Sequence, residues 1–154
     1  MVVLSCDHGG RDLALFLQEC LVKDGICVEG AISLEQTVDY PCVIPWMVQK
    51  VRYDKKMGIL VCGSGIGMSI SANRYQGIRA ALCHDETTAR LARQHNNANI
   101  LVLGGRLLGP VLAWQCVQVF LKTTFEGGHH QSRLAALEKD SKKVPFLYSS
   151  FQND

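Results

Sequence analysis

The sequence contains no apolar run of membrane-spanning length, because Lys, Arg, Asp or Glu interrupts every candidate. The formal net charge is only +2, which is too balanced for a chain whose main partner is nucleic acid. The chain also lacks repeats and low-complexity stretches before residue 144, and no basic segment with a cleavage site opens it. We therefore expect no membrane partner, no nucleic-acid partner and no signal peptide.

Paired-cysteine motifs are missing as well, although seven cysteines is a high number for 154 residues. No two of them have Cys-x-x-Cys spacing, which excludes zinc-ribbon and thioredoxin-like sites. Their number is odd, and we expect most to be buried free thiols in a reducing compartment, namely Cys20, Cys27, Cys83 and Cys116. The sequence thus predicts a cytoplasmic protein that needs no metal or disulfide to fold.

The sequence is rich instead in short apolar runs that alternate with longer amphipathic ones. Apolar residues make up 47% of the chain and charged residues 19%, which excludes a disordered or fibrous chain, and the length fits one domain. The patterns predict strands at 1–6, 26–29, 58–62, 78–83 and 100–103, and helices at 11–24, 43–53, 68–74, 85–95, 110–123 and 131–143.

These strands are apolar on both faces, so helices must cover both faces of the sheet. The predicted fold class is therefore α/β: a Rossmann-like three-layer sandwich with a five-stranded parallel sheet and a C-terminal helix. We expect a single domain over residues 1–143 and a separate tail over 144–154.

A glycine-rich loop follows the strand predicted at 58–62. Gly63, Gly65 and Gly67 occupy alternate positions, so the backbone can turn tightly and point its N–H groups at an anion. The spacing matches neither the P-loop nor the dinucleotide pattern G-x-G-x-x-G. Cys62 directly precedes the loop, and a helix N-terminus favours the thiolate, which is a base or a nucleophile. The alternative is a tight turn beside an inert core cysteine.

Other polar residues follow neighbouring strands, whose carboxyl ends form the ligand-binding edge of a parallel sheet. Asp7 and His8 follow the first strand; they are either groups for proton transfer and hydrogen bonding, or a helix N-cap beside a surface histidine. Arg106 follows the fifth strand, and a guanidinium such as that of Arg106 or Arg133 can donate to two phosphate oxygens. Each arginine is alternatively an ordinary surface residue.

Two further polar groups lie away from that edge. His95 and Asn96 end the helix predicted at 85–95, toward the other edge of the sheet, so they either serve a neighbouring subunit or merely end the helix. The pair His129–His130 is too isolated in the sequence to predict a metal site.

The order and spacing of these motifs resemble those of the type B ribose-5-phosphate isomerases, a family that also contains allose-6-phosphate and galactose-6-phosphate isomerases. The similarity is densest over residues 58–109, GILVCGSGIGMSISANRYQGIRAALCHDETTARLARQHNNANILVLGGRLLG. Further matches are SCDH at 5–8, DYP at 39–41 and EGGHHQSR at 126–133. The resemblance extends from residue 2 to about residue 139.

The resemblance implies a metal-free, cofactor-free aldose–ketose isomerase that interconverts D-ribose 5-phosphate and D-ribulose 5-phosphate through an enediolate. It implies homodimers or homotetramers whose active sites are shared between two subunits. Cys62 is implied as the base that moves a proton between C2 and C1, and Ser64 as a donor to the enediolate. Asp7 is implied to handle the hydroxyl protons, and His95 to open the furanose ring. The implied substrate-binding residues are His8, Tyr40, Gly63, Gly65, Gly67, Asn96, Arg106, His129 and Arg133.

The sequence departs from the family at two positions: His129 stands where arginine is common, and Asn97 where aspartate is usual. Arginine stays charged whereas histidine is only partly charged at neutral pH, so we expect phosphate binding to be weaker and to decline as pH rises. Two other functions stay open: isomerisation of a six-carbon sugar phosphate (allose or galactose 6-phosphate), and non-catalytic sensing of a sugar phosphate.

Overall fold

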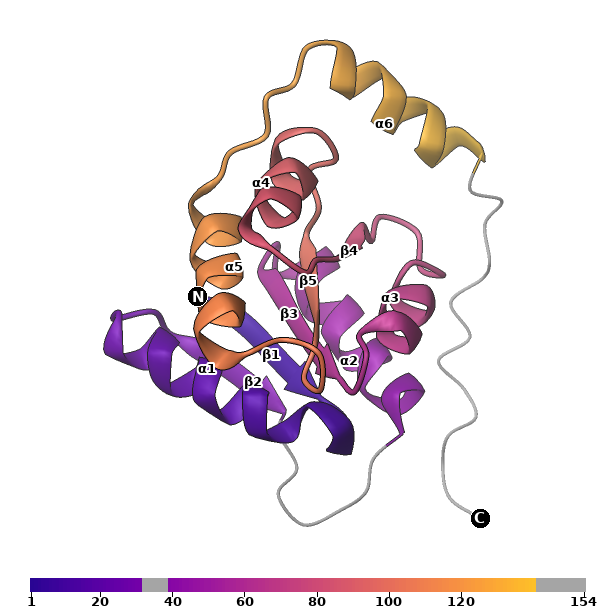
Figure 1. Ribbon diagram of the computed structural model, residues 1–154. Helices are drawn as coiled ribbons and strands as arrows, with labels where there is room; N and C mark the ends of the chain where they lie inside the picture. Colours follow the sequence, from indigo (N-terminus) through magenta and orange to yellow (C-terminus); the bar gives the residue numbers. More distant parts are fainter. Residues whose placement is uncertain (32–38, 141–154) are drawn as a thin grey trace, which may run out of the picture.

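A five-stranded parallel sheet with helices on both faces forms the body of the computed structural model, which describes residues 1–31 and 39–140 (Figure 1). The strands are ordered β2-β1-β3-β5-β4 across the sheet. The elements follow the chain as β1 (Val2–Cys6), the short 3-10 helix η1 (His8–Gly10), α1 (Arg11–Lys23), β2 (Val28–Ala31), α2 (Tyr40–Tyr53), β3 (Met57–Cys62), α3 (Ile66–Ala72), β4 (Ala80–Leu82), α4 (Glu86–Gln94), β5 (Ile100–Gly104), α5 (Pro110–Lys122) and α6 (His129–Asp140). The predicted fold class is confirmed.

The two faces of the sheet are buried by different helices. Successive side chains of a strand point to opposite faces, so Ile59 packs with α1, α4 and α5, whereas its neighbour Leu60 packs with α2 and α3. Both residues are fully buried. Strands apolar on both faces therefore give a core on each side of the sheet, as the sequence pattern predicts.

Strands β1 and β3 are adjacent and parallel, and the order in which strands are added to the sheet reverses between them. From β1 the chain passes through α1 to β2 on one side, and from β3 it passes through α3 toward β4 on the other. The loops that leave the two strands diverge, and ligands of open α/β sheets bind in such a crevice.

Several predicted boundaries need correction. Helix α2 begins at Tyr40, three residues before the predicted start at 43, with a proline in its first turn, and Pro45 lies inside the helix. Proline is favoured in the first turn of a helix because the N–H it lacks would have no partner there. Pro41 and Pro45 were therefore both plausible starting points. Helix α6 begins at His129 rather than residue 131. The expected end of this helix at 143 and the tail 144–154 lie outside the described residues.

Helix α6 stands apart from the sandwich, beyond the end of α4 (Figure 1). A salt bridge of 3.1 Å joins Glu138 of α6 to Arg79, just before β4. Leu134 is buried, whereas Leu137 is 67% exposed. Within residues 1–31 and 39–140, no helix has the length and apolar character that crossing a bilayer requires.

Candidate active site

A cavity of about 330 Å³ lies at the carboxyl ends of β1, β3 and β5. That volume is at the lower end of the range of small-molecule sites. Its walls come from the three loops that follow these strands, and they are Asp7, His8, Gly9, Cys62, Gly63, Ser64, Gly67, Arg106 and Leu107. The structure thus brings together seven residues that the sequence singled out from three separate segments.

Cys62 ends β3 with its thiol held at the wall of this cavity. The backbone N–H of Gly65 donates to Cys62 Sγ over 3.1 Å, and the residue is only 4% exposed. Gly65 reaches this position with φ at +81°, where an added Cβ would lie 2.3 Å from Leu82 Cδ1. The glycine is therefore favoured by its backbone conformation, and a Cβ here would also displace the end of the Leu82 side chain.

Asp7 is both a helix cap and a wall of the cavity. Its Oδ1 accepts hydrogen bonds from the backbone N–H groups of Gly9 at 2.8 Å and Gly10 at 3.1 Å. The residue is 8% exposed. The N-cap interpretation of Asp7 is thus correct, and the same hydrogen bonds fix the carboxylate beside the thiol of Cys62 in the cavity lining.

The floor of the cavity is made of main chain in close contact. A Cβ on Gly10 would lie 2.3 Å from the carbonyl oxygen of Val61, so only glycine fits there. The N–H of Gly105 donates to the carbonyl of Cys62 at 2.7 Å, and the N–H of Arg106 donates to that of Gly63 at 3.0 Å. The loops after β1, β3 and β5 therefore form one rigid unit.

The cavity suits a polar anion. Arg106 lies against the loop, since a Cβ on Gly63 would be 3.6 Å from its guanidinium carbon. Cys6 lies next to Asp7 in the sequence but is a poor candidate for a thiolate. Burial raises its pKa to about 11, and the charge of Asp7 adds a smaller contribution. Among the cysteines, Cys62 is the one that faces the cavity.

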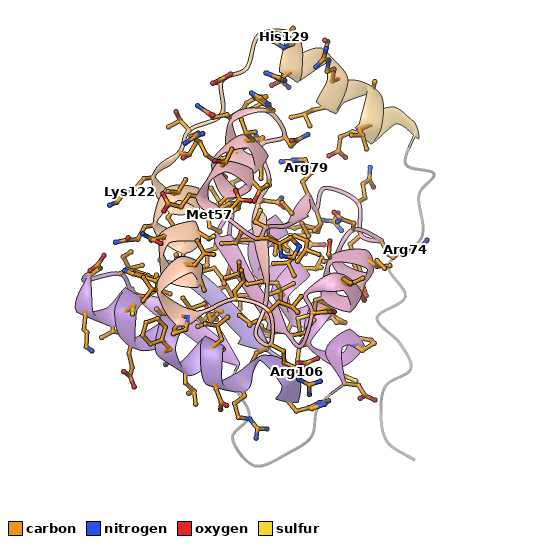
Figure 2. All side chains as sticks on the ribbon, viewed as in Figure 1. Met57, Arg74, Arg79, Arg106, Lys122 and His129 are labelled. Atoms are coloured by element: carbon orange, nitrogen blue, oxygen red, sulfur yellow. The ribbon has the colours of Figure 1, made fainter. Side chains whose placement is uncertain are left out.

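Four predicted site residues lie at the opposite end of the sheet: His95, Asn96, His129 and Arg133. Figure 2 shows His129 and Arg106 at opposite ends of the molecule. His95 caps the C-terminus of α4, near the amino ends of the strands. A strand rises about 3.3 Å per residue, so the two ends of the five-residue β5 alone are ~15 Å apart. One subunit therefore does not bring these four residues to the cavity.

At that far end, His95 belongs to a compact cluster. Its ring stacks on the ring of His130, with centroids 4.3 Å apart and an interplanar angle of 13°. The Nε2 atoms of His95 and His130 each lie 3.9 Å from Oε2 of Glu126. Burial lowers the pKa of His130, followed by the nearby charges of His129, His95 and Arg133, while Glu126 opposes them.

Arg93 holds the turn that carries His95, and sequence reasoning missed it. Its Nη1 donates to Asn97 Oδ1 at 2.9 Å and to the carbonyl of Ala98 at 2.5 Å, and its Nε donates to the carbonyl of Thr123 at 3.3 Å. Asn97 adopts φ of +45°, a conformation that asparagine tolerates better than most residues. The guanidinium is buried, which lowers the pKa of Arg93.

Other residues of the two regions were also missed. Leu107 lines the cavity although nothing in its sequence context marks it. Glu126 appeared only as part of a matching run, and His130 only in a pair with His129 that was too isolated in the sequence to predict a site. The glycine at position 9 follows Asp7-His8, and that adjacency was the available signal. Tyr40 begins α2, and its side chain lies outside what the structure describes. The expectation of burial is wrong for Cys27, which is exposed, and for Cys20, which is half-buried, and it is confirmed for Cys83 and Cys116.

Comparison with known proteins gives consistent matches along the chain. Residues 2–137 match the family described as Ribose/Galactose Isomerase. Ribose-5-phosphate isomerase B of Escherichia coli K12 is 40% identical over 139 residues, covering 88% of this chain and 93% of the relative. A crystal structure of a ribose 5-phosphate isomerase from Thermotoga maritima has a TM-score of 0.87 and 46% identity, covering 90% of this chain and 97% of that one. Ribose-5-phosphate isomerase B from Mycoplasma genitalium, solved with bound ribulose-5-phosphate, has a TM-score of 0.82 and 35% identity, covering 90% and 93%.

Proposed function

Since the chain belongs to the ribose/galactose isomerase family, we propose that it is an aldose–ketose isomerase that interconverts D-ribose 5-phosphate and D-ribulose 5-phosphate. The observation that carries this function is the thiol of Cys62 at the wall of a cavity also lined by a carboxylate, a guanidinium and a glycine loop. A sugar-phosphate sensor needs no proton-moving groups at its binding site, so this arrangement favours an enzyme.

The reaction moves one proton from C2 to C1 of the open-chain sugar. In our proposal the thiolate of Cys62 takes the C2 proton, the electron pair forms the C1–C2 double bond of an enediolate, and the thiol returns the proton to C1. The carbonyl shifts from C1 to C2, so the sugar is neither oxidised nor reduced overall. The N–H groups and Ser64 of the loop over residues 63–67 donate to the enediolate oxygens where charge develops.

Asp7 is proposed to carry the proton that moves between the two oxygens. Both of its hydrogen bonds from the η1 backbone go to Oδ1, so Oδ2 is left to face the substrate hydroxyls. The rigid cap fixes the direction of this carboxylate, and fixed direction is what proton transfer requires. His8, Gly63, Gly65, Gly67 and Arg106 are proposed to bind the substrate around it.

A second subunit is proposed to complete each site. We propose that this subunit supplies His95 as the ring-opening group and Asn96, His129 and Arg133 as substrate ligands. All four lie at the far end of their own sheet from Cys62. A symmetric dimer in which the far end of one subunit faces the cavity of the other places all of these groups around one sugar phosphate. The separate position of α6 leaves its surface available for such a contact (Figure 1).

The test is an isomerase assay with ribose 5-phosphate in metal-free buffer, comparing the wild type with Cys62→Ala. We expect Cys62→Ala to lose nearly all of kcat while ligand binding is retained. The matched control is Cys42→Ala, an exposed cysteine on α2 that does not line the cavity. A Cys62→Ala variant as active as the wild type contradicts the mechanism, and binding without turnover in the wild type supports a sensor.

The six-carbon alternative is tested in the same assay. The cavity of about 330 Å³ belongs to one subunit, and the residues proposed to close it come from another. A side-by-side kcat/KM for ribose 5-phosphate, allose 6-phosphate and galactose 6-phosphate decides the preference, which we propose is for the five-carbon sugar.

We propose a cytoplasmic location for this activity. All seven cysteines fall within the described residues, and all seven are free thiols, including the exposed Cys27 and Cys42. Free exposed thiols persist in reducing compartments. Localisation of the tagged full chain in cell fractions tests the proposal.

A further inference from the structure

The cluster at the far end of the sheet has a geometry that hydrogen bonding does not explain. The Nε2 atoms of His95 and His130 both face Oε2 of Glu126, each at 3.9 Å, which is longer than a hydrogen bond. One ligand atom from each of the three residues lies within 4.8 Å of the other two. Three potential ligand atoms thus lie close together without hydrogen bonding to one another. Because the rings of His95 and His130 are stacked at 13°, one imidazole has to rotate for both Nε2 lone pairs to point at the same ion.

These distances match the space that a small divalent cation fills. Zinc binds imidazole nitrogen and carboxylate oxygen at about 2.0–2.2 Å, so two ligand atoms on one ion lie roughly 3.3–4.2 Å apart. Two of the three separations already fall in this range. Two imidazoles and one carboxylate form a set that zinc uses when it keeps a fourth position open.

The backbone around the cluster holds the three ligands in place. The N–H of Glu126 donates to the carbonyl of Gln94, beside His95, over 3.0 Å. The turn that follows contains Gly127 and Gly128, both with positive φ, and the N–H of His130 donates to the carbonyl of Gly127 over 3.1 Å. Side-chain exposures of 41% for His95 and 49% for Glu126 leave a path for an ion from solvent.

We propose that His95, Glu126 and His130 form a divalent-cation site of the zinc type, and that an ion bound there inhibits the isomerase. The inhibitory part rests on the proposed function, because a cation on Nε2 of His95 occupies the lone pair that ring opening requires. Arg133 and His129 lie near the cluster and oppose a positive ion, so affinity depends on all three ligands acting together.

The binding test uses Co²⁺ as an optical probe and Zn²⁺ as its competitor, on the full-length protein. We expect one ion per chain, with visible cobalt bands and none of the charge-transfer absorption that a thiolate ligand produces. Losing a residue that only supports a metal ligand weakens metal binding by about 10–100-fold. Glu126→Gln, an exposed and nearly isosteric change, alters a ligand itself, so it should weaken binding by more than that. His130→Gln should act alike, and His84→Gln, an exposed histidine outside the cluster, should bind as the wild type does.

The inhibition test measures ribose 5-phosphate turnover with added Zn²⁺ and then with EDTA. We expect reversible inhibition of the wild type and of His84→Gln, and loss of that inhibition in Glu126→Gln and His130→Gln. Binding that both variants retain, a thiolate band, or zinc that binds without inhibiting overturns the proposal. An inactive wild type in metal-free buffer instead refutes the proposed function, and the cobalt titration still decides the site.

Discussion

At the scale of single residues, His129 is one of two positions, with Asn97, at which we expect this chain to differ in charge from its family. It is exposed at the opposite end of the molecule from Arg106 (Figure 2), which lines the same cavity as Cys62, and we propose that the partner subunit brings it to the phosphate. A neutral histidine can donate one hydrogen bond to phosphate and a protonated one adds a positive charge, whereas arginine stays charged and can donate two hydrogen bonds at any physiological pH. We therefore expect the histidine to lower the affinity for the phosphate group.

We predict that KM for ribose 5-phosphate rises in the wild type between pH 6 and pH 8, and that His129→Arg lowers KM by about tenfold at pH 8. The variant should also flatten the pH dependence with little change in kcat. Steady-state kinetics at several pH values check this, with His84→Arg as the control for added surface charge. A wild-type KM that stays constant over this range argues against a phosphate role for His129.

Buried thiols make a second prediction at this scale. Burial raises the pKa of Cys83 to about 12 and that of Cys116 to about 11, from an ordinary value of 9.0. Since the folded pKa values are the higher ones, these thiols stabilise the fold fully below pH 9 and lose that contribution as pH rises through 11 to 12.

The free energy of unfolding should therefore fall above pH 9, by about 1 kcal/mol per thiol at pH 10. Urea denaturation of the wild type and of a Cys83→Ala/Cys116→Ala variant at pH 8, 9 and 10 measures it. The variant should be less stable at pH 8 and show a shallower decline. Equal declines in the two proteins contradict this account.

At the scale of elements, the loop between β3 and α3 depends on main-chain conformation more than on side-chain chemistry. Gly65 combines a φ of +81° with a Cβ position 2.3 Å from Leu82. Gly25 has a similar φ of +72°, but nothing lies within 4 Å of its Cβ position. The two glycines thus separate backbone strain from packing.

Gly65→Ala should lower the free energy of unfolding by about 1–3 kcal/mol, because it combines backbone strain with a clash against Leu82. Gly25→Ala, with backbone strain alone, should lower it by about 1 kcal/mol. Gly65→Ala should also reduce kcat, since the N–H that donates to Cys62 Sγ is displaced. Thermal unfolding and the isomerase assay measure the two effects. Similar losses of stability and activity in both variants contradict the packing argument.

Elements were predictable where one physical signal dominated. The apolar runs of β1, β3 and β5 identified the central strands, and Asp85 with Thr88 marked the start of α4, where a capping box is found. Helix α2 was placed three residues late because two prolines, at 41 and 45, both suit a helix start. Strand β4 is shorter than expected because the N–H of Ile78 donates to the carbonyl of Tyr75 and that of Arg79 to Asn99 Oδ1, so neither joins the sheet, and because the strand ends at Leu82.

At the scale of the whole molecule, the site residues fall into two groups at opposite ends of the sheet. The group around Cys62 was predictable because each member directly follows a strand, and parallel strands bring their carboxyl ends together. The contacts of His95 with Glu126 and His130 were not predictable, because they join the end of α4 to a turn that lies some thirty residues later in the sequence. No periodicity of the sequence encodes that approach.

Mixing two inactive variants tests the shared site. Cys62→Ala and His95→Ala each remove one half, so a mixed dimer has one site with both defects and one intact site. Co-expression in equal amounts should restore about a quarter of the wild-type activity if subunits pair at random as dimers. Cys62→Ala with Asp7→Ala, both in the same cavity, is the matched control and should restore none. Equal activity of the two mixtures contradicts a shared site.

The floor formed by the loops after β1, β3 and β5 has a consequence for how such a protein can diversify. Its contacts join carbonyls and amides where no side chain larger than hydrogen fits, as at Gly10. A substitution in this floor would disrupt the backbone contacts that position Cys62, so few substitutions are tolerated there. We expect changes in sugar specificity to arise at the exposed far end that carries His129 and Arg133, where residues can change without disturbing the fold.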